Sequence, residues 1–199
     1  MKTVNLTPKK ERLLFLLPGR GMNPALMRFY FKSFEEQYLI VTIDPEDHWY
    51  PSPNGPNNQT AAVEGVEKRA VELAEFISNK SCELGYTTSE TALAGFSAGA
   101  VMGLEVSFLI KNLLFVISCS GAILDVYQVR DLKNISSKYF LIHGMDDTVF
   151  SWKERFLPTQ KFLTDSQLQV TCLTSNLISH EIHRGMIDAC LNLFNASNT

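Results

Sequence analysis

Short apolar runs alternate along the chain with longer segments in which apolar residues recur every three or four positions. The runs occupy residues 12–17, 38–43, 91–94, 113–118, 138–144 and 168–173. Runs of this length that lack a polar alternation are typical of parallel strands covered on both faces. Each is therefore predicted to be a buried strand.

Helical spacing appears between these runs, at residues 25–34 and 61–79, and after the last of them, at residues 182–194. The apolar residues after Gly99 also favour a helix. Pro24 is suited to the first turn of one helix. Thr60 is expected to cap another. Strands that alternate with helices predict an α/β fold with a mostly parallel central sheet and helices on both faces. With 199 residues and no internal repeat or linker, residues 1–199 are expected to form a single domain.

Residues 44–60 form a segment rich in proline and asparagine, with Trp49 and Tyr50 in its middle. A loop of this length in a compact domain is more often functional than idle. The two aromatic side chains could wall a ligand pocket or pin the loop to the body of the protein. The sequence leaves both interpretations open.

Composition excludes several classes of partner. The net charge of −3 and the absence of a Lys/Arg run give no basis for binding nucleic acid. No apolar run is long enough to span a membrane, and the polar N-terminal residues lack the apolar core of a signal peptide. The four cysteines are widely separated, which favours buried free thiols over a disulfide framework or a zinc site. We expect a cytoplasmic protein.

The motif with the clearest chemistry is Gly95-Phe96-Ser97-Ala98-Gly99, a G-x-S-x-G sequence between a predicted strand and a predicted helix. A serine on such an abrupt turn is lifted clear of the sheet with a strained backbone and an exposed hydroxyl. Glycines two residues to either side remove side chains that would collide across the turn. Ser97 is thus a candidate nucleophile.

A serine nucleophile needs a base to take its proton and a carboxylate to orient that base. Asp146 and Asp147 follow the strand at 138–144, and His180 and His183 follow the strand at 168–173, in the order acid then histidine. Asp146 also suits a turn of its own backbone. Asp125, after the preceding strand, is a reserve acid, and His143 is expected to pack at a strand end.

At this point the chain resembles the phospholipase/carboxylesterase family of α/β-hydrolases, from the turn at Pro18-Gly19-Arg20-Gly21 to the last helix. The family's G-F-S-x-G turn matches here and implies that Ser97 is the nucleophile. Its H-G-x-x-D-x-V segment is matched by His143, Gly144, Asp147 and Val149, which assigns the acid to Asp147. Its G-H segment matches at His180 but not at the preceding Ser179, and assigns the base to His180.

The resemblance also implies an oxyanion hole formed by the backbone N–H groups of Arg20 and Ala98. Two residues depart from the family's pattern, because Pro18 stands where the turn usually has histidine and Ala98 stands where glutamine usually follows the serine. Neither departure removes a backbone donor. Trp49-Tyr50-Pro51 resembles a W-Y-P segment of many members, so Trp49 and Tyr50 are candidate substrate-binding residues.

These observations together predict a compact α/β-hydrolase fold without a large lid. The expected activity is hydrolysis of a small-molecule carboxylic ester or thioester of short to medium acyl length, through an acyl-enzyme on Ser97. No metal or cofactor is required for it. The loop with Trp49 and Tyr50 and the segment 150–163 are expected to shape the acyl pocket, and a homodimer is an assembly that the family allows.

Alternatives remain within and outside this chemistry. The same residues could serve an acyl-protein thioesterase or lysophospholipase, acyl transfer to an alcohol, or lactone hydrolysis. From a different class, the chain could be a catalytically inactive α/β-hydrolase that acts as a binding protein, for which the departures at Pro18 and Ala98 give some ground.

Overall fold

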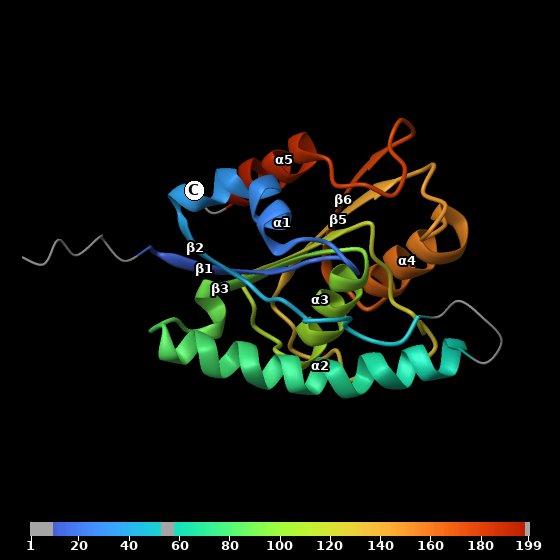
Figure 1. Cartoon of the computed structure of the whole chain (residues 1–199), viewed down its shortest axis with the longest axis horizontal. Coiled ribbons are helices and arrows are strands. Elements are labelled where there is room, and N and C mark those ends of the chain that lie inside the picture. Colours follow the sequence, from blue (N-terminus) through green and yellow to red (C-terminus); the bar gives the residue numbers. More distant parts are fainter. Residues whose placement is uncertain (1–9, 53–57, 198–199) are drawn as a thin grey trace, which may run out of the picture.

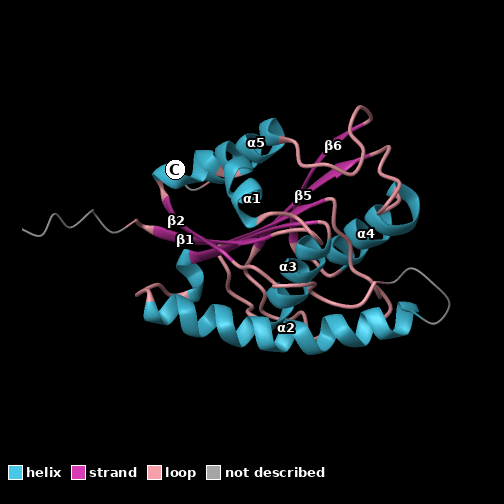
Figure 2. Ribbon diagram, viewed as in Figure 1, coloured by secondary structure: helices cyan, strands magenta, loops and turns pink. Residues whose placement is uncertain are grey.

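The apolar runs become a parallel sheet whose strand order is β2-β1-β3-β4-β5-β6 in the computed structural model, which describes residues 10–52 and 58–197 (Figures 1 and 2). The strands are β1 (Arg12–Leu17), β2 (Tyr38–Thr42), β3 (Thr91–Phe96), β4 (Phe115–Cys119), β5 (Lys138–Gly144) and β6 (Gln169–Ser175). Every neighbouring pair in this sheet is parallel. The carboxyl ends of all these strands therefore meet at one edge.

Helices cover both faces of the sheet. They are α1 (Pro24–Tyr30), α2 (Asn58–Glu83), α3 (Ala98–Leu109), α4 (Leu157–Asp165) and α5 (Arg184–Ala196). Short 3₁₀ turns occur at η1 (Lys32–Glu36) and η2 (Thr88–Glu90), and a π-helical turn, η3 (Trp152–Phe156), precedes α4. Helices α1 and α5 lie on one face, whereas α2 and α3 lie on the other, with α3 between the long α2 and the sheet (Figure 1).

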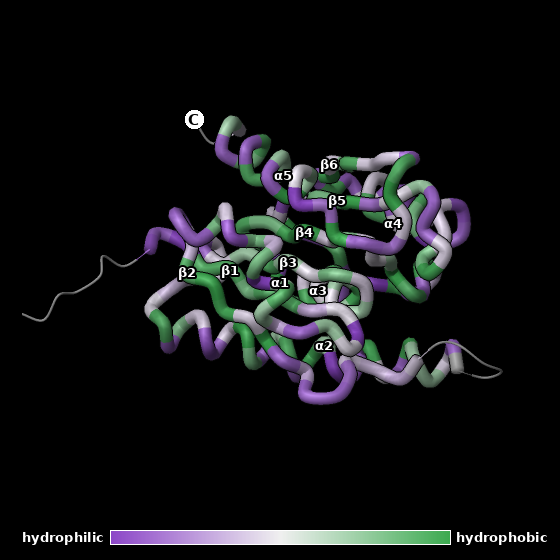
Figure 3. The backbone as a smooth tube through the Cα atoms, turned by 45° about the horizontal axis from the view of Figure 1, so that its top comes forward, coloured by the Kyte–Doolittle hydropathy of each residue, from purple (hydrophilic) through white to green (hydrophobic). Residues whose placement is uncertain are grey.

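Strand β1 shows how the sequence divides the core into two layers. Leu13, Phe15 and Leu17 enter the cluster beneath α2 and α3, while Leu14 and Leu16 enter the cluster beneath α1 and α5. Successive side chains of a strand point to opposite faces, so a continuous apolar run feeds both layers at once. Apolar residues accordingly gather along the strands in the middle of the molecule, whereas apolar and polar residues alternate along α2 (Figure 3).

The order of the strands places a switch point at the centre of the sheet. After β1 the chain crosses to β2 on one side, and it then returns to place β3 on the other side of β1. In open parallel sheets, ligands bind outside the carboxyl ends of the strands at such a point. The turn that contains Ser97 follows β3 at this position.

The predicted α/β class is confirmed, and each predicted strand lies within two residues of its observed bounds. Thr60 does not cap this helix, because α2 begins at Asn58. Gln59 and Thr60 are polar and exposed, so the sequence carries no apolar signal for the start of the helix. The last helix begins at Arg184 rather than at residue 182. Residues 152–165 form η3 and α4, a helical stretch for which no regular apolar spacing is seen in the sequence.

Other expectations meet the structure only in part. Cys119 and Cys190 are buried free thiols as expected, but Cys82 is exposed and Cys172 is partly exposed. In the described residues, no helix is both long and apolar enough to cross a membrane. The polar N-terminal residues 1–9 and residues 53–57 of the expected loop lie outside the described part of the chain.

Two glycines of α3 provide a matched test of the packing that holds this helix against β1. A Cβ on Gly99 would lie 2.0 Å from the carbonyl oxygen of Leu17, whereas a Cβ on Gly103 would meet only the Leu17 side chain, at 3.6 Å. We expect Gly99→Ala to lower the free energy of unfolding by about 3 kcal/mol or more. Gly103→Ala should be neutral or stabilising by up to about 1 kcal/mol. Urea unfolding measures both free energies, and equal changes for the two variants would contradict this account.

Candidate active site

Ser97 lies between the last residue of β3 and the first residue of α3, with φ 53° and ψ −119°. A positive φ is uncommon for a residue with a side chain and persists only where the surroundings enforce it. A Cβ on Gly95 would lie 2.4 Å from the carbonyl oxygen of Gly99, so both glycines permit backbone contacts that no other residue could make. The strained turn presents a partly exposed Ser97 at the edge of the sheet.

The histidine and the aspartate proposed from the resemblance lie within hydrogen-bonding distance of each other and of the serine. His180 Nε2 is 2.9 Å from Ser97 Oγ, and His180 Nδ1 is 2.8 Å from Asp147 Oδ2. The three residues follow β3, β5 and β6 and converge from the carboxyl ends of these strands. The geometry fits a neutral imidazole that donates from Nδ1 to the carboxylate and accepts at Nε2 from the hydroxyl.

Asp147 is buried and held by the turn that follows it. Its Oδ1 accepts hydrogen bonds from the backbone N–H groups of Val149 and Phe150, both at 2.8 Å. Burial by itself raises the pKa of this carboxyl, but the hydrogen bonds and the adjacent His180 outweigh burial and lower the pKa below its ordinary value. Asp147 is therefore ionised at neutral pH and ready to orient the imidazole.

The loop that carries His180 is attached to the turn that carries Asp147. Met145 N–H donates to the carbonyl of Ser175 at 2.8 Å, and a Cβ on Gly144 would lie 2.1 Å from the carbonyl oxygen of Ile178. The rings of Phe96 and Phe150 lie 5.2 and 5.9 Å from the His180 ring. These contacts restrain an imidazole that stands on a loop three residues before the cap of α5.

His143, the other histidine of the motif, lies behind the acid rather than beside the serine. Its side chain is fully buried, its Nε2 is 2.8 Å from the carbonyl oxygen of Phe150, and its Nδ1 has no hydrogen-bond partner among the described residues. Because a carbonyl only accepts, Nε2 must carry the proton, and Nδ1 is left as a bare acceptor. Burial lowers the pKa of His143, so this ring is neutral at pH 7.

The two expected oxyanion donors flank Ser97. Ala98 is the first residue of α3, and the N–H groups of a first helical turn have no partner within the helix. Arg20 lies in the turn after β1, and its N–H forms no hydrogen bond with another described residue. A Cβ on the neighbouring Gly19 would lie 3.3 Å from Ser97 Cβ, which shows how near this turn comes to the serine.

A cavity of about 260 Å³ opens beside Ser97. Its walls are formed by Arg20, Tyr50, Ser52, Gln59, Ser97, Ala98, Leu124, Val149, Phe150 and Arg155. Tyr50 belongs to this lining but Trp49 does not, since the Trp49 indole N–H donates to the carbonyl of Pro18 at 2.7 Å. The geometry thus divides the two roles left open for the loop: Tyr50 walls the pocket and Trp49 pins the loop.

The other residues weighed from the sequence form no hydrogen bond with Ser97 or His180 in the described part of the chain. Asp125 accepts a hydrogen bond from the backbone of Tyr127, Asp146 is exposed, and His183 is exposed at the cap of α5. Phe150 and Arg155 belong to the segment expected to shape the pocket, and both line the cavity. Nothing in the sequence marks Arg155 as a site residue, because its segment lacks a motif or a regular spacing.

A parallel sheet with helices on both faces, and a serine, a histidine and an aspartate together at its carboxyl edge, defines the α/β-hydrolase class. The model of the phospholipase/carboxylesterase family matches residues 11–197. The chain belongs to this family and is a hydrolase of the carboxylesterase/phospholipase type.

Solved structures agree with this fold. Esterase PE8 is 22% identical, with a TM-score of 0.81 and coverage of 94% of this chain and 93% of that chain. A phospholipase/carboxylesterase from Dyadobacter fermentans is 19% identical, with a TM-score of 0.75 and coverage of 94% and 90%. A carboxylesterase from Bacillus cereus is 17% identical, with a TM-score of 0.77 and coverage of 94% and 88%. At these identities the likeness establishes the fold.

The neutral state of buried His143 predicts a loss of stability in mild acid. Because its pKa is lower in the folded protein, the unfolded chain binds a proton more readily below about pH 6.5. The free energy of unfolding should therefore fall as the pH drops below about 6.5 and stay level above it as far as His143 is concerned. Asp147 adds a similar loss only near and below about pH 3.8.

The measurement is urea unfolding of the wild type and of His143→Gln at pH 8 and pH 5. Glutamine keeps a donor for the Phe150 carbonyl but does not titrate. The wild type should lose more stability between the two pH values than the variant does. The other histidines are common to both proteins, so an equal loss would contradict the assignment.

Proposed function

We propose that the protein hydrolyses small carboxylic esters or thioesters through a covalent acyl-enzyme on Ser97. The observation that carries this proposal is the continuous contact from Asp147 Oδ2 through His180 to Ser97 Oγ, at 2.8 and 2.9 Å. Nucleophile, base and orienting acid in hydrogen-bonding reach of one another are the arrangement that acyl transfer to a serine requires.

In the first half of the reaction, Ser97 Oγ attacks the acyl carbonyl while His180 Nε2 takes the hydroxyl proton. Asp147 keeps the proton on Nδ1 and stabilises the imidazolium that forms. His180 then gives its proton to the departing alcohol or thiol, and the acyl group stays on Ser97. In the second half, a water molecule attacks the acyl-enzyme with His180 again as the base, and the acid is released.

The negative oxygen of each tetrahedral intermediate is assigned to the N–H groups of Arg20 and Ala98. Donors fixed in advance where charge develops are each worth about 3 kcal/mol of barrier. The positive end of α3 points toward the same place. Backbone donors also explain why the side chain at position 98 can be alanine.

The size and lining of the cavity favour short to medium acyl chains. The volume of about 260 Å³ is enclosed by Tyr50, Leu124 and Phe150 together with polar residues, rather than by a long apolar groove. The alternative activities, acyl-protein thioesterase or lysophospholipase, use the same steps on a larger substrate. They would need the acyl chain or the leaving group to extend beyond this cavity.

An inactive binding protein is the rival proposal from another class. The departures at Pro18, where the family's turn usually has histidine, and at Ala98, where the family usually has glutamine, give this alternative some ground. In this chain the turn is braced in another way, because the carbonyl of Pro18 accepts the indole N–H of Trp49. The brace supports a working turn, and the ordered contacts among Ser97, His180 and Asp147 favour the enzyme.

Replacing the nucleophile tests the proposal. Ser97→Ala should lower kcat/KM for p-nitrophenyl acetate and butyrate by roughly 10⁴-fold or more, since the remaining groups cannot form an acyl-enzyme. Ser89→Ala is the matched control, because Ser89 is exposed and lies just before β3, at the opposite end of that strand from Ser97.

The control should retain wild-type kinetics. A Ser97→Ala protein that is folded and fully active would contradict the mechanism. Run with palmitoyl esters and thioesters as well, the same assay tests the acyl preference, and best turnover on palmitoyl substrates would refute the expectation of short to medium chains.

A further inference from the structure

The cavity beside Ser97 has a one-sided charge. Its lining contains two guanidinium groups, Arg20 and Arg155, and no aspartate or glutamate. The chain as a whole carries a net charge of −3, so positive charge at this position is not the average character of the protein. Two cations in the cavity that Ser97 lines must affect which substrates enter this cavity.

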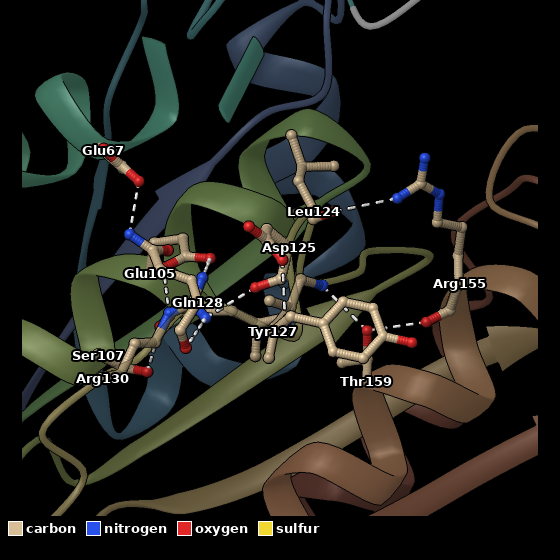
Figure 4. A network of polar contacts seen from close by, with 12 residues as sticks. Glu67, Glu105, Ser107, Leu124, Asp125, Tyr127, Gln128, Arg130, Arg155 and Thr159 are labelled. Atoms are coloured by element: carbon tan, nitrogen blue, oxygen red, sulfur yellow. Dashed lines mark hydrogen bonds and ion pairs between the residues drawn. The ribbon is translucent and has the colours of Figure 1, made fainter. Parts of the chain in front are cut away.

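Arg155 is held at the cavity by neutral groups only. Its Nη1 donates to the carbonyl of Leu124 at 3.2 Å, and its Nη2 donates to Gln59 Oε1 at 3.3 Å. The backbone at Arg155 is fixed by Thr159. The Thr159 hydroxyl donates to the Arg155 carbonyl at 2.8 Å and accepts from the N–H of Ile123 at 2.9 Å (Figure 4). The side chain is thus positioned, but its charge is not neutralised by a carboxylate of the described residues.

Arg130 gives a contrast within the same region. Its guanidinium forms two hydrogen bonds with the carboxylate of Glu105, at 2.8 and 3.1 Å, and both side chains are about nine-tenths buried (Figure 4). Arg28 and Arg69 also pair with carboxylates. Arg28, Arg69 and Arg130 are thus each paired with a carboxylate. Arg155 is not paired with a carboxylate of the described residues.

Arg20 reaches the same cavity from the other side. Its guanidinium donates to the carbonyl of Tyr50 and lies 5.9 Å from the centre of the Tyr50 ring. It forms no ion pair with any described residue. Burial raises the pKa of the Tyr50 phenol, and the charges of Arg20 and Arg155 both oppose this rise, so the two cations act on one shared space.

We propose that Arg155, assisted by Arg20, binds an acidic group of the substrate, a carboxylate or a phosphate, in the part of the ester remote from the reacting carbonyl. This inference rests on the proposed function and names its substrate class. A guanidinium offers five donors in a planar fork that matches two oxygens of a carboxylate or phosphate. Arg155 commits two of them to neutral acceptors over 3 Å away.

Matched substrate pairs test the proposal on the intact protein. Monoethyl succinate and ethyl succinamate differ only in a carboxylate or a carboxamide on the acyl side. Acetoxyacetate and acetoxyacetamide make the same comparison on the alcohol side, and ethyl 3-phosphonopropanoate replaces the carboxylate by a phosphate-like group. Product release followed by NMR gives kcat/KM for each. We expect at least one acidic ester to exceed its amide by about tenfold or more.

Variants then assign the preference to Arg155. Arg155→Met should lower the ratio of acidic to amide kcat/KM by about tenfold, and Arg155→Lys should lower it less, because the charge remains and the fork is lost. Arg28→Met is the control, since Arg28 is exposed on α1 and pairs with Glu35. If Arg155→Met does not fold, a wild-type ratio that falls with added NaCl supports the proposal, and a ratio independent of salt overturns it.

The outcomes separate this inference from the proposed function. The acidic ester and its carboxamide could give equal kcat/KM in both pairs while Ser97-dependent hydrolysis of p-nitrophenyl acetate is intact. That result overturns the proposed preference for an acidic substrate and leaves the proposed function standing. A proportional loss on both members of a pair in Arg155→Met also overturns this preference, because that result indicates a structural tether. Failure to hydrolyse any ester overturns the proposed function and this inference together.

Discussion

The contact between the start of α3 and the end of β1 governs the geometry of the whole site. The backbone of Gly99 lies so near the carbonyl of Leu17 that a Cβ would approach it to 2.0 Å. Because α3 is drawn in this closely, the chain must turn within one residue after β3, and Ser97 takes the positive φ of that turn. The same approach brings Gly19 and Arg20 beside the serine, so the proposed nucleophile and its expected oxyanion donors are positioned by one packing constraint.

The parallel sheet supplies the remaining groups. Asp147 follows β5 and His180 follows β6, two neighbouring strands in register from Lys138–Gln169 to Gly144–Ser175. Their loops are joined where Met145 bonds to the carbonyl of Ser175. Buried strands thus align the loops, and two backbone hydrogen bonds fix the orientation of the Asp147 carboxylate. Catalytic groups on loops can be precise when the sheet beneath them is rigid.

The sequence was sufficient where a local pattern has a single physical meaning. The run at 138–144 coincides with β5 because an uninterrupted apolar segment has few other stable environments. It was insufficient where packing decides. Trp49 and Tyr50 are adjacent aromatic residues in one loop, yet one binds the Pro18 carbonyl and the other faces the cavity. The π-helical turn at 152–156, which carries Arg155, depends on tertiary contacts such as the Leu124 carbonyl that no local motif encodes.

The central claim is that Ser97 is a nucleophile activated by His180 and Asp147. The most direct measurement is labelling of the purified protein with a fluorophosphonate, followed by intact mass and peptide mapping. A single adduct on Ser97, absent from Ser97→Ala and formed at least about a hundredfold more slowly by His180→Ala, is the predicted result. A folded wild-type protein that forms no adduct, or forms it on another residue, would contradict the account.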